Sequence, residues 1–392
     1  MTDVRRVLVV HNRYQQRGGE DSVVDAEVAL LQRRGHAVEL LDRDNEEVRG
    51  VGQLRLAAQA LWSQRTVRDL TSVCARFKPD IVHVHNTLPL ISPSVFWTAH
   101  RIGLPVVQTL HNFRLLCPQA MFLRDGSVCE DCLGHVPWRA VVHACYRGSR
   151  SQSAVVAAVI QTHRVVGTWR SEVDRYIALN EFCRRKLIEG GLPPQRIRVK
   201  PNFVDLPVPP EGPREGFLFA GRLSEEKGIR VLAQAWQRSV TQPPLTIAGT
   251  GPLQASLQGL DRVSMLGVVS PQSLAERMAR AVALIMPSVW YESFPRTLVE
   301  AFACGLPVIA SRLGAMAELV SDGQTGLLAT AGDPDDLARI VDWAETHRAE
   351  MRVMGQNARR HYESHWTGDI NHQQLVTIYD EAIAEFGRRD AR

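Results

Sequence analysis

The chain has 392 residues, more than the roughly 250 to 300 that one hydrophobic core usually supports, so the sequence predicts two domains. Its 45% hydrophobic and 22% charged residues are ordinary for a folded globular protein and exclude a disordered or fibrous chain. The formal net charge of +4 is mild. Because the sequence contains no RNA-binding or helix-turn-helix motif, we expect no nucleic acid partner.

The first segment, MTDVRRVLVVHN, is typical of a β-strand. It lacks the long apolar core and small-residue cleavage site of a signal peptide. The longest apolar run, residues 153–160, is too short to cross a bilayer. We therefore expect a cytoplasmic protein that touches membranes only peripherally.

Short β-branched runs alternate with helical patterns through the first half of the chain. RRVLVVHN precedes SVVDAEVALLQRRG and HAVELLDR, and later runs are DIVHVHN, PVVQTLHN and RYIALN. This order predicts a parallel sheet with right-handed crossovers. Since ligands of such sheets bind beyond the carboxyl ends of the strands, the polar residues that end these runs face a potential site: His11, Asn12, His83, His85, Asn86, His111 and Asn112.

His83 and His85 alternate along their predicted strand, so only one of them is expected to face the side of the sheet that His111 shares. A buried structural histidine is an equally good interpretation of each. Two further strand-end residues, Asn180 and Asn202, are weaker candidates for the lining of the site.

The segment 113–150 interrupts the alternation and contains four of the seven cysteines: Cys117, Cys129, Cys132 and Cys145. The C-x2-C pair suits half of a metal site, but the flanking spacings match no standard zinc pattern. Structural zinc, reduced thiols and disulfides stay open as interpretations, although a reducing compartment disfavours the last. His135 and His143 are substitute ligands if one cysteine is not used.

Residues 131–200 hold 12 Lys/Arg against 5 Asp/Glu, a local balance of +7. A charge excess of this size is typical of a solvated basic face. It also suits a phosphate-rich partner or an anionic membrane surface, so peripheral membrane contact is a second interpretation.

Residues 206–216, LPVPPEGPREG, have the Pro and Gly density of a linker. The alternation then restarts with GFLFAGRL, PLTIAGTGP, VSMLGVV, ALIMPS and PVIASRL, which predicts a second doubly wound sheet. Leu375, Tyr379, Ile383 and Phe386 recur at helical spacing near the end. The predicted division is therefore 1–205, 206–368 and a final helix within 369–392.

The loop in FLFAGRLSEEKG follows a strand that ends at Gly221, and it contains Arg222 and Lys227. Two cations beside glycines, at the carboxyl edge of a parallel sheet, can hold a diphosphate. Surface cations balanced by the intervening Glu225 and Glu226 are the structural alternative.

The stretch WYESFPRTLVEAFACGLPV places Glu292 and Glu300 eight residues apart. Pro295 suits the first turn of a helix that the GLP at 305–307 ends, so Glu292 precedes the helix and Glu300 lies within it. Eight helical residues would turn about 800°, leaving the carboxylates roughly 80° apart. The two carboxylates therefore suit contacts with separate groups better than a shared role in general acid–base catalysis. The helix N-terminus offers N–H groups to an anion, although Pro295 has none.

Taken in order, HNRYQQRGGED, TLHN, VKPNFVD, FAGRLSEEKG, IAGTGP, PSVWYESFPRTLVEAFACGLPVIAS and ELVSDGQTGLL resemble the retaining GT-B glycosyltransferases of family 4. The resemblance spans nearly the whole chain, and the E-x7-E element combined with the G-R-L-x-x-x-K-G loop makes it specific. It implies an α/β fold with two Rossmann-like, doubly wound domains that face a cleft. It also implies a C-terminal helix that crosses back to the first domain, and hinges near 203–215 and 365–372.

The resemblance implies roles for the matching residues. Arg222 and Lys227 would neutralise the donor diphosphate, Glu300 would bind the nucleotide ribose, and Glu292 would lie beside the donor sugar. His111 would contact the transferred sugar. The other implied donor-binding residues are Gly18 and Gly19, in a loop over the donor phosphates, and Gly221, Ser293, Phe294, Arg296, Gly249 and Gly251.

Two positions depart from the family pattern. Pro295 stands where glycine is common, and Gly314-Ala315 stands where a glycine pair is frequent. Neither change removes a charged group, so the departures put the sugar preference in question rather than activity.

The resemblance implies a retaining transfer of sugar from a nucleotide diphosphate sugar, held by the second domain, to an acceptor held by the first. The acceptor would be a saccharide, a lipid-linked sugar or a small molecule in glycoconjugate synthesis, and no catalytic metal or cofactor would be needed. Cations and helix amides suit the charge that develops on a leaving diphosphate. A nucleotide-sugar epimerase of the same fold and a catalytically silent nucleotide-sugar binding subunit are the alternatives.

Overall fold

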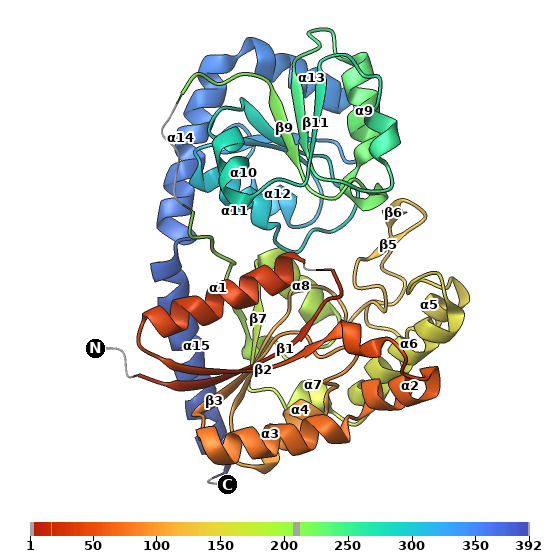
Figure 1. Cartoon of the computed structure of the whole chain (residues 1–392), viewed down its shortest axis with the longest axis vertical. Helices are drawn as coiled ribbons and strands as arrows, with labels where there is room; N and C mark the ends of the chain where they lie inside the picture. Colours follow the sequence, from red (N-terminus) through yellow and green to blue (C-terminus); the bar gives the residue numbers. More distant parts are fainter. Residues whose placement is uncertain (1–3, 17, 207–211, 391–392) are drawn as a thin grey trace. The chain divides into compact units, whose positions relative to one another are not determined.

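The computed structural model describes residues 4–16, 18–206 and 212–390, with side chains as far as residue 388. The chain divides into two compact units (Figure 1). The first unit comprises Met1–Met121, Glu130–Pro201 and Asn371–Arg392, and the second comprises Phe122–Cys129 and Asn202–Ile370. The short segment Phe122–Cys129, within the predicted insertion, thus groups with the second unit.

The first unit is built on a six-stranded parallel sheet with the strand order β2-β1-β3-β4-β7-β8. All five strand pairings are parallel, and the order reverses direction beside β1, as in doubly wound folds. The strands are β1 (Arg6–Arg13), β2 (Ala37–Asp44), β3 (Ile81–Val84), β4 (Val106–Thr109), β7 (Arg175–Ala178) and β8 (Ile197–Val199). Strands β1, β3 and β4 are almost wholly buried because both faces of the sheet are covered, whereas the edge strand β2 is partly exposed.

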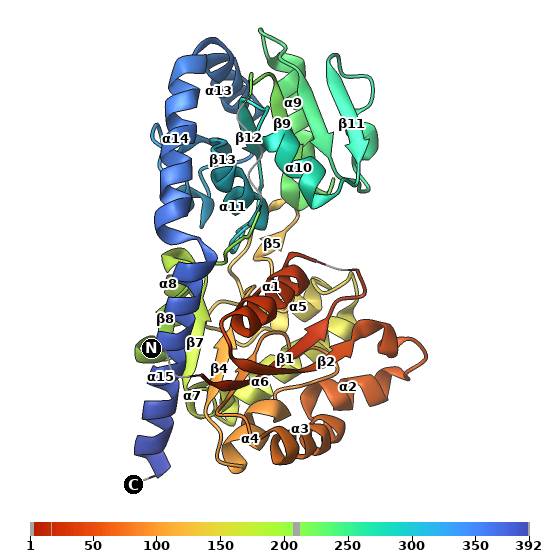
Figure 2. The same ribbon diagram turned by 60° about the vertical axis from the view of Figure 1, so that its left-hand side comes forward.

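Helices cover both faces of this sheet, with α1 on one side and α3 and α4 on the other in both views (Figures 1 and 2). The final helix, α15, packs with α1 on the sheet: Leu375 and Tyr379 share a buried cluster with Val9 and Val24. The helices are α1 (Gly19–Arg33), α2 (Gln53–Leu61), α3 (Gln64–Phe77), α4 (Ser94–Arg101), α5 (Trp138–Val142), α6 (Arg150–Val165), α7 (Thr168–Ser171), α8 (Glu181–Glu189) and α15 (Gly368–Asp390). The predicted return of the last helix to the first sheet is confirmed.

The second unit contains another six-stranded parallel sheet, in the order β11-β10-β9-β12-β13-β14. The predicted pair of doubly wound sheets is therefore confirmed. The strands are β9 (Phe217–Ala220), β10 (Leu245–Ala248), β11 (Val263–Gly267), β12 (Ala283–Met286), β13 (Val308–Ser311) and β14 (Gly326–Ala329). The helices are α9 (Ile229–Arg238), α10 (Pro271–Met278), α11 (Arg296–Ala303), α12 (Met316–Leu319), α13 (Pro334–Thr346) and α14 (Arg348–His365).

The core of the second unit fills the space between this sheet and its helices. Phe217 and Phe219 of β9 pack with Trp236 of α9 and Val341 of α13, all buried. Helix α9 presents Ile229, Leu232 and Trp236 on one face, with the three- and four-residue spacing of an amphipathic helix.

Two smaller features complete the description. A short antiparallel hairpin pairs β5 (Leu123–Arg124) with β6 (Ser127–Val128). Across the described residues, none of the helices combines the length and apolar character that a membrane crossing requires.

Candidate active site

The cation loop of the second unit follows β9. A 3₁₀ turn, Glu225–Lys227, ends at Gly228, whose φ of 71° lies in the left-handed region and whose absent Cβ leaves room for the Pro287 carbonyl. Arg222 is exposed at the start of this loop, and Lys227 is half-buried at its end. The loop therefore holds both predicted cations at the carboxyl edge of the sheet.

The predicted glycines after β10 fit against this loop. A Cβ on Gly249 would lie 1.9 Å from the Gly221 carbonyl oxygen, and one on Gly251 would lie 2.4 Å from that of Leu223. The Leu223 amide donates to the Thr250 carbonyl at 2.9 Å, which joins the two loops. Close backbone packing is thus sufficient to explain why glycine occupies positions 249 and 251. Their predicted contact with the nucleotide-sugar donor stays a prediction.

Glu292 lies next to Lys227, although 65 residues separate them in the chain. Lys227 Nζ donates to Glu292 Oε1 at 2.6 Å, and the Ser288 hydroxyl donates to the same oxygen at 2.8 Å. Glu292 is only 4% exposed, and the Lys227 ammonium lies 5.5 Å from the centre of the Trp290 ring. The site thus combines a buried carboxylate with a cation held against it.

Helix α11 begins directly after Pro295, which precedes the first turn instead of lying within it. The helix ends at Ala303, and Gly305 follows with φ 62°, so the predicted stop is confirmed. Glu292 lies before the helix and Glu300 inside it, as the sequence predicts. The two carboxylates therefore make separate contacts.

Glu300 is buried and accepts a hydrogen bond from Arg296 Nε at 2.8 Å. Burial raises the pKa of Glu300, and the Arg296 guanidinium opposes that rise. Arg296 is thus the partner of Glu300, one helical turn before it. Phe294 packs edge-to-face on Trp366 with ring centres 5.4 Å apart, so its place is in the core, while Ser293 is partly exposed.

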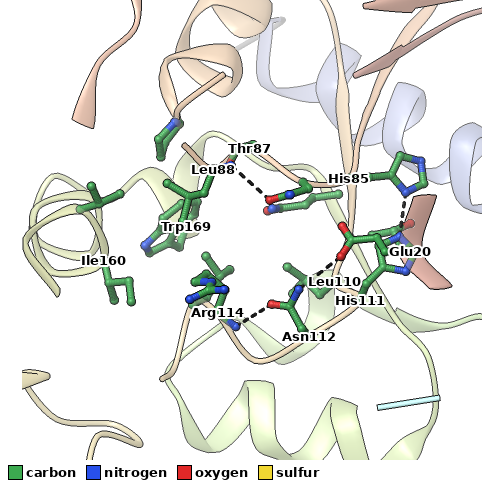
Figure 3. Close-up of a pocket in the computed structure, with 16 residues that line it drawn as sticks. Glu20, His85, Thr87, Leu88, Leu110, His111, Asn112, Arg114, Ile160 and Trp169 are labelled. Carbon is green, nitrogen blue, oxygen red and sulfur yellow. Dashed lines mark hydrogen bonds between the residues drawn. The ribbon is translucent and has the colours of Figure 1, made fainter. Parts of the chain in front are cut away.

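The first unit contains a pocket at the carboxyl ends of β3 and β4 (Figure 3). Glu20, His85, His111, Asn112 and Arg114 line its polar part. Its apolar part includes Leu88, Leu110, Leu115, Val159, Ile160 and Trp169. His111 therefore lines a pocket, and its predicted contact with the transferred sugar stays a prediction.

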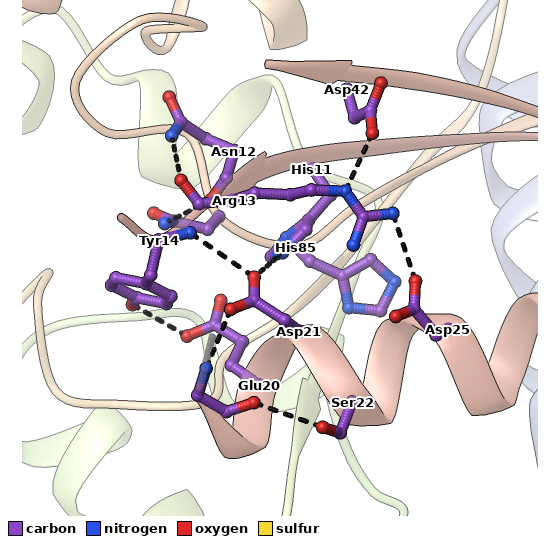
Figure 4. Close-up of polar contacts among 12 residues, drawn as sticks. His11, Asn12, Arg13, Tyr14, Glu20, Asp21, Ser22, Asp25, Asp42 and His85 are labelled. Atoms are coloured by element: carbon purple, nitrogen blue, oxygen red, sulfur yellow. Dashed lines mark hydrogen bonds and ion pairs between the residues drawn. The ribbon is translucent and has the colours of Figure 1, made fainter. Parts of the chain in front are cut away.

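The loop before α1 is fixed by carboxylates on that helix (Figure 4). Gly18 N donates to Asp21 Oδ2 at 2.9 Å, and His11 Nε2 lies 2.8 Å from Asp21 Oδ1. The Tyr14 hydroxyl donates to Glu20 Oε2 at 2.8 Å, and burial raises the pKa of Glu20. A Cβ on Gly18 or Gly19 would meet no other atom within 4 Å, and their predicted place over the donor phosphates stays a prediction.

Behind His111, the structure gathers residues that the sequence did not single out as functional. Glu27 of α1 forms a buried ion pair with Lys200, with Lys200 Nζ 2.9 Å from Glu27 Oε2. Glu27 Oε1 lies 3.2 Å from His83 Nδ1 and 3.5 Å from His85 Nε2. One sequence signal could have found Glu27, because it occupies the apolar face that Val23, Leu30 and Leu31 define on α1.

The expectation that only one of His83 and His85 shares a side with His111 is wrong. Both rings approach Glu27, and their centres are 4.3 Å apart. Strand β3 ends at Val84, so His85 lies beyond the pleat and is not bound by its alternation. Asn180 caps α8, accepting from Cys183 N at 2.8 Å, and Asn202 is buried.

Among the described residues, no three of the four cysteines of the insertion have ligand atoms at metal-binding distance from one another. In the part of the chain that the structure describes, no disulfide joins any of the seven cysteines, and Cys129 closes the hairpin by donating its amide to the Phe122 carbonyl. Among the described residues, the one group of three or more potential ligands whose atoms lie within 4.8 Å of one another is Glu27, His83 and His85. The predicted ligand set of Cys117, Cys129, Cys132 and Cys145, with His135 or His143 as substitutes, is therefore not brought together.

Comparisons with known proteins agree with this arrangement. The family model "Glycosyltransferase Family 4" matches residues 17–207, and "Glycosyl transferases group 1" matches residues 214–346. A D-inositol 3-phosphate glycosyltransferase of Acidothermus cellulolyticus is 30% identical over 78% of this chain and 68% of that protein. An uncharacterized glycosyltransferase of Methanocaldococcus jannaschii is 22% identical over 91% of this chain and 93% of that protein.

Solved structures share the fold. A sucrose-phosphate synthase of Thermosynechococcus elongatus matches with a TM-score of 0.70 at 18% identity, over 97% of this chain and 100% of that one. HepE of Anabaena in complex with UDP-glucose matches with a TM-score of 0.66 at 18% identity, over 96% and 100%. With two doubly wound sheets, a cation loop, the paired glutamates and these matches, the chain belongs to the GT-B glycosyltransferases of family 4.

Proposed function

We propose that this glycosyltransferase moves a sugar from a nucleotide diphosphate sugar to an acceptor with retention of the anomeric configuration. The contact between Lys227 and Glu292 carries the proposal. It places a cation and a buried carboxylate 2.6 Å apart at the carboxyl edge of a parallel sheet, where such folds bind ligands. HepE, which shares the fold, was solved with UDP-glucose, and this supports a nucleotide-sugar donor.

In the proposed reaction, negative charge grows on the leaving diphosphate while the sugar gains oxocarbenium character. Lys227 and Arg222 would stabilise the diphosphate, together with the amides at the start of α11. Glu292 would lie beside the sugar, where its charge favours the developing cation. Glu300 would accept hydrogen bonds from the ribose. Its side chain is buried, and among the described residues Arg296 is its one hydrogen-bond donor, which supports that role.

We propose further that this chemistry proceeds without a catalytic metal. Two side-chain cations and helix amides supply the charge stabilisation that a metal ion provides in other enzymes. Turnover that persists in the presence of a chelator such as EDTA would support this, whereas loss that a divalent ion restores would refute it.

The pocket of the first unit is the proposed acceptor site. Glu20, His111 and Asn112 offer hydrogen bonds, while the wall that contains Ile160 and Trp169 is apolar. A saccharide, a lipid-linked sugar or a small molecule suits this combination, as in polysaccharide or glycolipid synthesis. The similarity to a D-inositol 3-phosphate glycosyltransferase adds polyol phosphates to the acceptors to be tried.

We also propose that the protein works in the cytoplasm, peripherally at an anionic membrane. Residues 132–171 contain five arginines and no Asp or Glu. In the same stretch Val136, Trp138 and Val142 are 50% or more exposed, and the Arg139 guanidinium lies 5.6 Å from the Trp138 ring centre. Exposed apolar and aromatic side chains beside cations suit the headgroup region of an anionic bilayer.

A thermal-shift screen against UDP, GDP, ADP and their sugars tests the donor proposal, because a ligand of the native state raises the melting temperature by mass action. An assay with the donor alone separates the alternatives. An epimerase would interconvert the nucleotide sugar without an acceptor. A silent binding subunit would bind the donor and turn over neither donor nor acceptor.

A further inference from the structure

A buried ion pair lies behind the pocket of the first unit. Lys200 Nζ donates to Glu27 Oε2 at 2.9 Å and to Asn371 Oδ1 at 3.1 Å. The side chains of Lys200 and Glu27 are 2% and 3% exposed. Burial tends to raise the pKa of Glu27, but the attraction and hydrogen bond of the Lys200 ammonium, together with smaller contributions from His83 and His111, lower it overall. The interior therefore contains a fixed carboxylate charge beside the ring of His85.

Two atoms with no hydrogen-bond partner among the described residues face each other here. They are His85 Nε2 and Glu27 Oε1, which lie 3.5 Å apart. A protonated ring nitrogen presents a positive N–H to this oxygen, whereas a bare nitrogen presents a lone pair to a negative charge. Since such differences are magnified in a buried site, Glu27 favours the His85 tautomer with the proton on Nε2.

His83 responds to the same oxygen. Its Nδ1 lies 3.2 Å from Glu27 Oε1 and 2.8 Å from the Tyr379 hydroxyl, and its Nε2 lies 2.8 Å from Thr109 Oγ1. The carboxylate favours a proton on Nδ1, so the Thr109 hydroxyl donates to Nε2. Both rings therefore direct an N–H towards Glu27 Oε1, and of the two only His85 contacts His111.

The preference passes from His85 to His111. His85 Nδ1 and His111 Nε2 lie 2.9 Å apart (Figure 3), and in a bond between neutral rings one nitrogen donates and the other accepts. With its proton on Nε2, His85 can only accept through Nδ1. His111 therefore donates from Nε2, which leaves its own Nδ1 with a free lone pair.

We infer that Glu27, acting through His85, is a positioning residue that holds His111 in the tautomer with a bare Nδ1, an acceptor for a hydroxyl of the transferred sugar. The sugar contact rests on the proposed function. The tautomer is a property of the folded protein alone, and it can be measured without any substrate.

The protonation states agree with this geometry. Burial lowers the pKa of His111 to about 3 and that of His83 to about 4, and it holds the pKa of His85 well below its usual range. The rings are thus neutral near pH 7. The titratable groups around these rings are His11 of β1, Glu20 and Glu27 of α1, Lys200 after β8 and Tyr379 of α15, and Asp21 of α1 in turn contacts His11.

A divalent cation held by Glu27, His83 and His85 is the other use of this cluster, since their ligand atoms lie within 4.8 Å of one another. Lys200 argues against it. Its ammonium already balances the Glu27 charge, and a second cation beside it would be repelled at short range in a buried site. The function of Glu27, His83 and His85 is therefore to fix the histidine tautomers and not to bind a metal.

The test compares the wild-type protein with the double variant Glu27→Gln/Lys200→Met. The pair of changes removes both charges, because loss of one alone would leave the other buried without its counter-charge. Two-dimensional ¹H–¹⁵N spectra of protein labelled at histidine distinguish protonated from bare ring nitrogens, and a His111→Gln variant identifies the His111 signals. We expect His111 protonated on Nε2 in the wild type and a mixed or reversed tautomer in the double variant.

The chain offers a matched control. His36 Nε2 and His372 Nε2 form another buried pair, 2.9 Å apart, and His36 Nδ1 accepts from the Arg5 amide at 3.1 Å. A backbone N–H and not a carboxylate sets that tautomer, so it should be unchanged by the double variant. If the double variant does not fold, His85→Phe removes the acceptor at similar volume and should likewise free the His111 tautomer.

Two results would overturn the inference: a proton on Nδ1 of His111 in the wild type, or a His111 tautomer that neither variant alters. Kinetics add a second readout, since loss of one hydrogen bond should lower kcat/KM by about tenfold with nucleoside diphosphate affinity unchanged. Nucleoside diphosphate that fails to bind even the wild type would refute the proposed function and leave the tautomer result standing.

Discussion

The ammonium of Lys227 and the carboxylate of Glu292 form a 2.6 Å ion pair between two loops of the second unit. The Glu292 side chain is 6% exposed and that of Lys227 is 26% exposed. Lys227 therefore balances a buried charge on one side and remains accessible on the other. In the proposed function, the donor diphosphate would approach Lys227 from this accessible side while Glu292 keeps its contact.

Replacement of Lys227 by methionine should raise the activation barrier by about 2 to 4 kcal/mol, the range for a lost electrostatic donor in an active site, and kcat/KM should fall accordingly. The measurement is nucleoside diphosphate release under steady-state conditions. Arg230→Met is the matched control, because Arg230 lies just beyond the same loop, pairs with Glu225 and is 58% exposed. Equal activity of the Lys227 and Arg230 variants would contradict the assignment.

Substitutions of Glu292 and Glu300 should affect different kinetic and binding parameters. Glu292→Gln should reduce kcat strongly with little change in donor affinity, because its carboxylate acts on charge that develops in the transition state. Glu300→Gln should instead weaken nucleotide binding by about 1.5 to 3 kcal/mol, the contribution of a charged hydrogen bond. Calorimetric titration with the nucleoside diphosphate, combined with kcat, separates the two, and matching profiles would show that the roles are wrongly divided.

His100 should make the first unit lose stability as the pH rises. Burial would lower its pKa, but the hydrogen bonds to Asp174 and Glu172 outweigh it and raise the pKa to about 9. Since the folded-state pKa exceeds the unfolded value of 6.5, the contribution is complete below pH 6.5 and is lost as the pH rises through 9. Over that window it amounts to about 3 kcal/mol.

The check is the melting temperature of wild type and His100→Gln between pH 6 and pH 10. The difference in melting temperature between the two proteins should be largest at pH 6 and should shrink towards pH 10. Taking this difference cancels the titration of the groups that both proteins share. A difference that does not change with pH would mean that His100 is neutral in the folded protein.

The insertion should contain reduced thiols. Among the described residues, no three of its cysteines lie at metal-ligand distance and no disulfide joins any of the seven, so unfolding should expose seven titratable thiols. Thiol titration in denaturant and metal analysis of the purified protein provide the check. One equivalent of zinc per chain would show that the insertion folds around a metal after all.

The basic and apolar surface around α5 should bind anionic vesicles. Flotation with vesicles of phosphatidylglycerol should recover the protein at low salt and not at high salt, since exposed charges are screened. Trp138→Ser should reduce recovery, and Val240→Ser is a suitable control because Val240 is 89% exposed in the other unit. Recovery that neither vesicle charge nor Trp138 affects would contradict the proposal.

Much of the fold could be predicted from the sequence because its signals are local. Runs such as RRVLVVHN and GFLFAGRL form buried parallel strands, and the helical spacing of Leu375 and Tyr379 marks the face of α15 that joins the first core. The hairpin β5–β6 was not predicted, because strands of two residues have no periodicity to detect.

The site was predictable only in part. The positions of Lys227 and Glu292 follow from the motifs, but their contact depends on how two loops meet across the sheet edge. Helical spacing places Glu27 on the apolar face of α1, but its pairing with Lys200 spans 173 residues and no local signal indicates that partner. The placement of His85 depends on where β3 ends, and strand ends are poorly marked in sequence.

The most direct test of the central claim follows the anomeric configuration by ¹H NMR, with the nucleotide sugar that gives the largest thermal shift and an acceptor chosen from saccharides, lipid-linked sugars and polyol phosphates. We predict release of the nucleoside diphosphate together with a product whose anomeric configuration is that of the donor, and loss of both in Glu292→Gln. A product of inverted configuration, or conversion of the donor without transfer, would contradict a retaining glycosyltransferase.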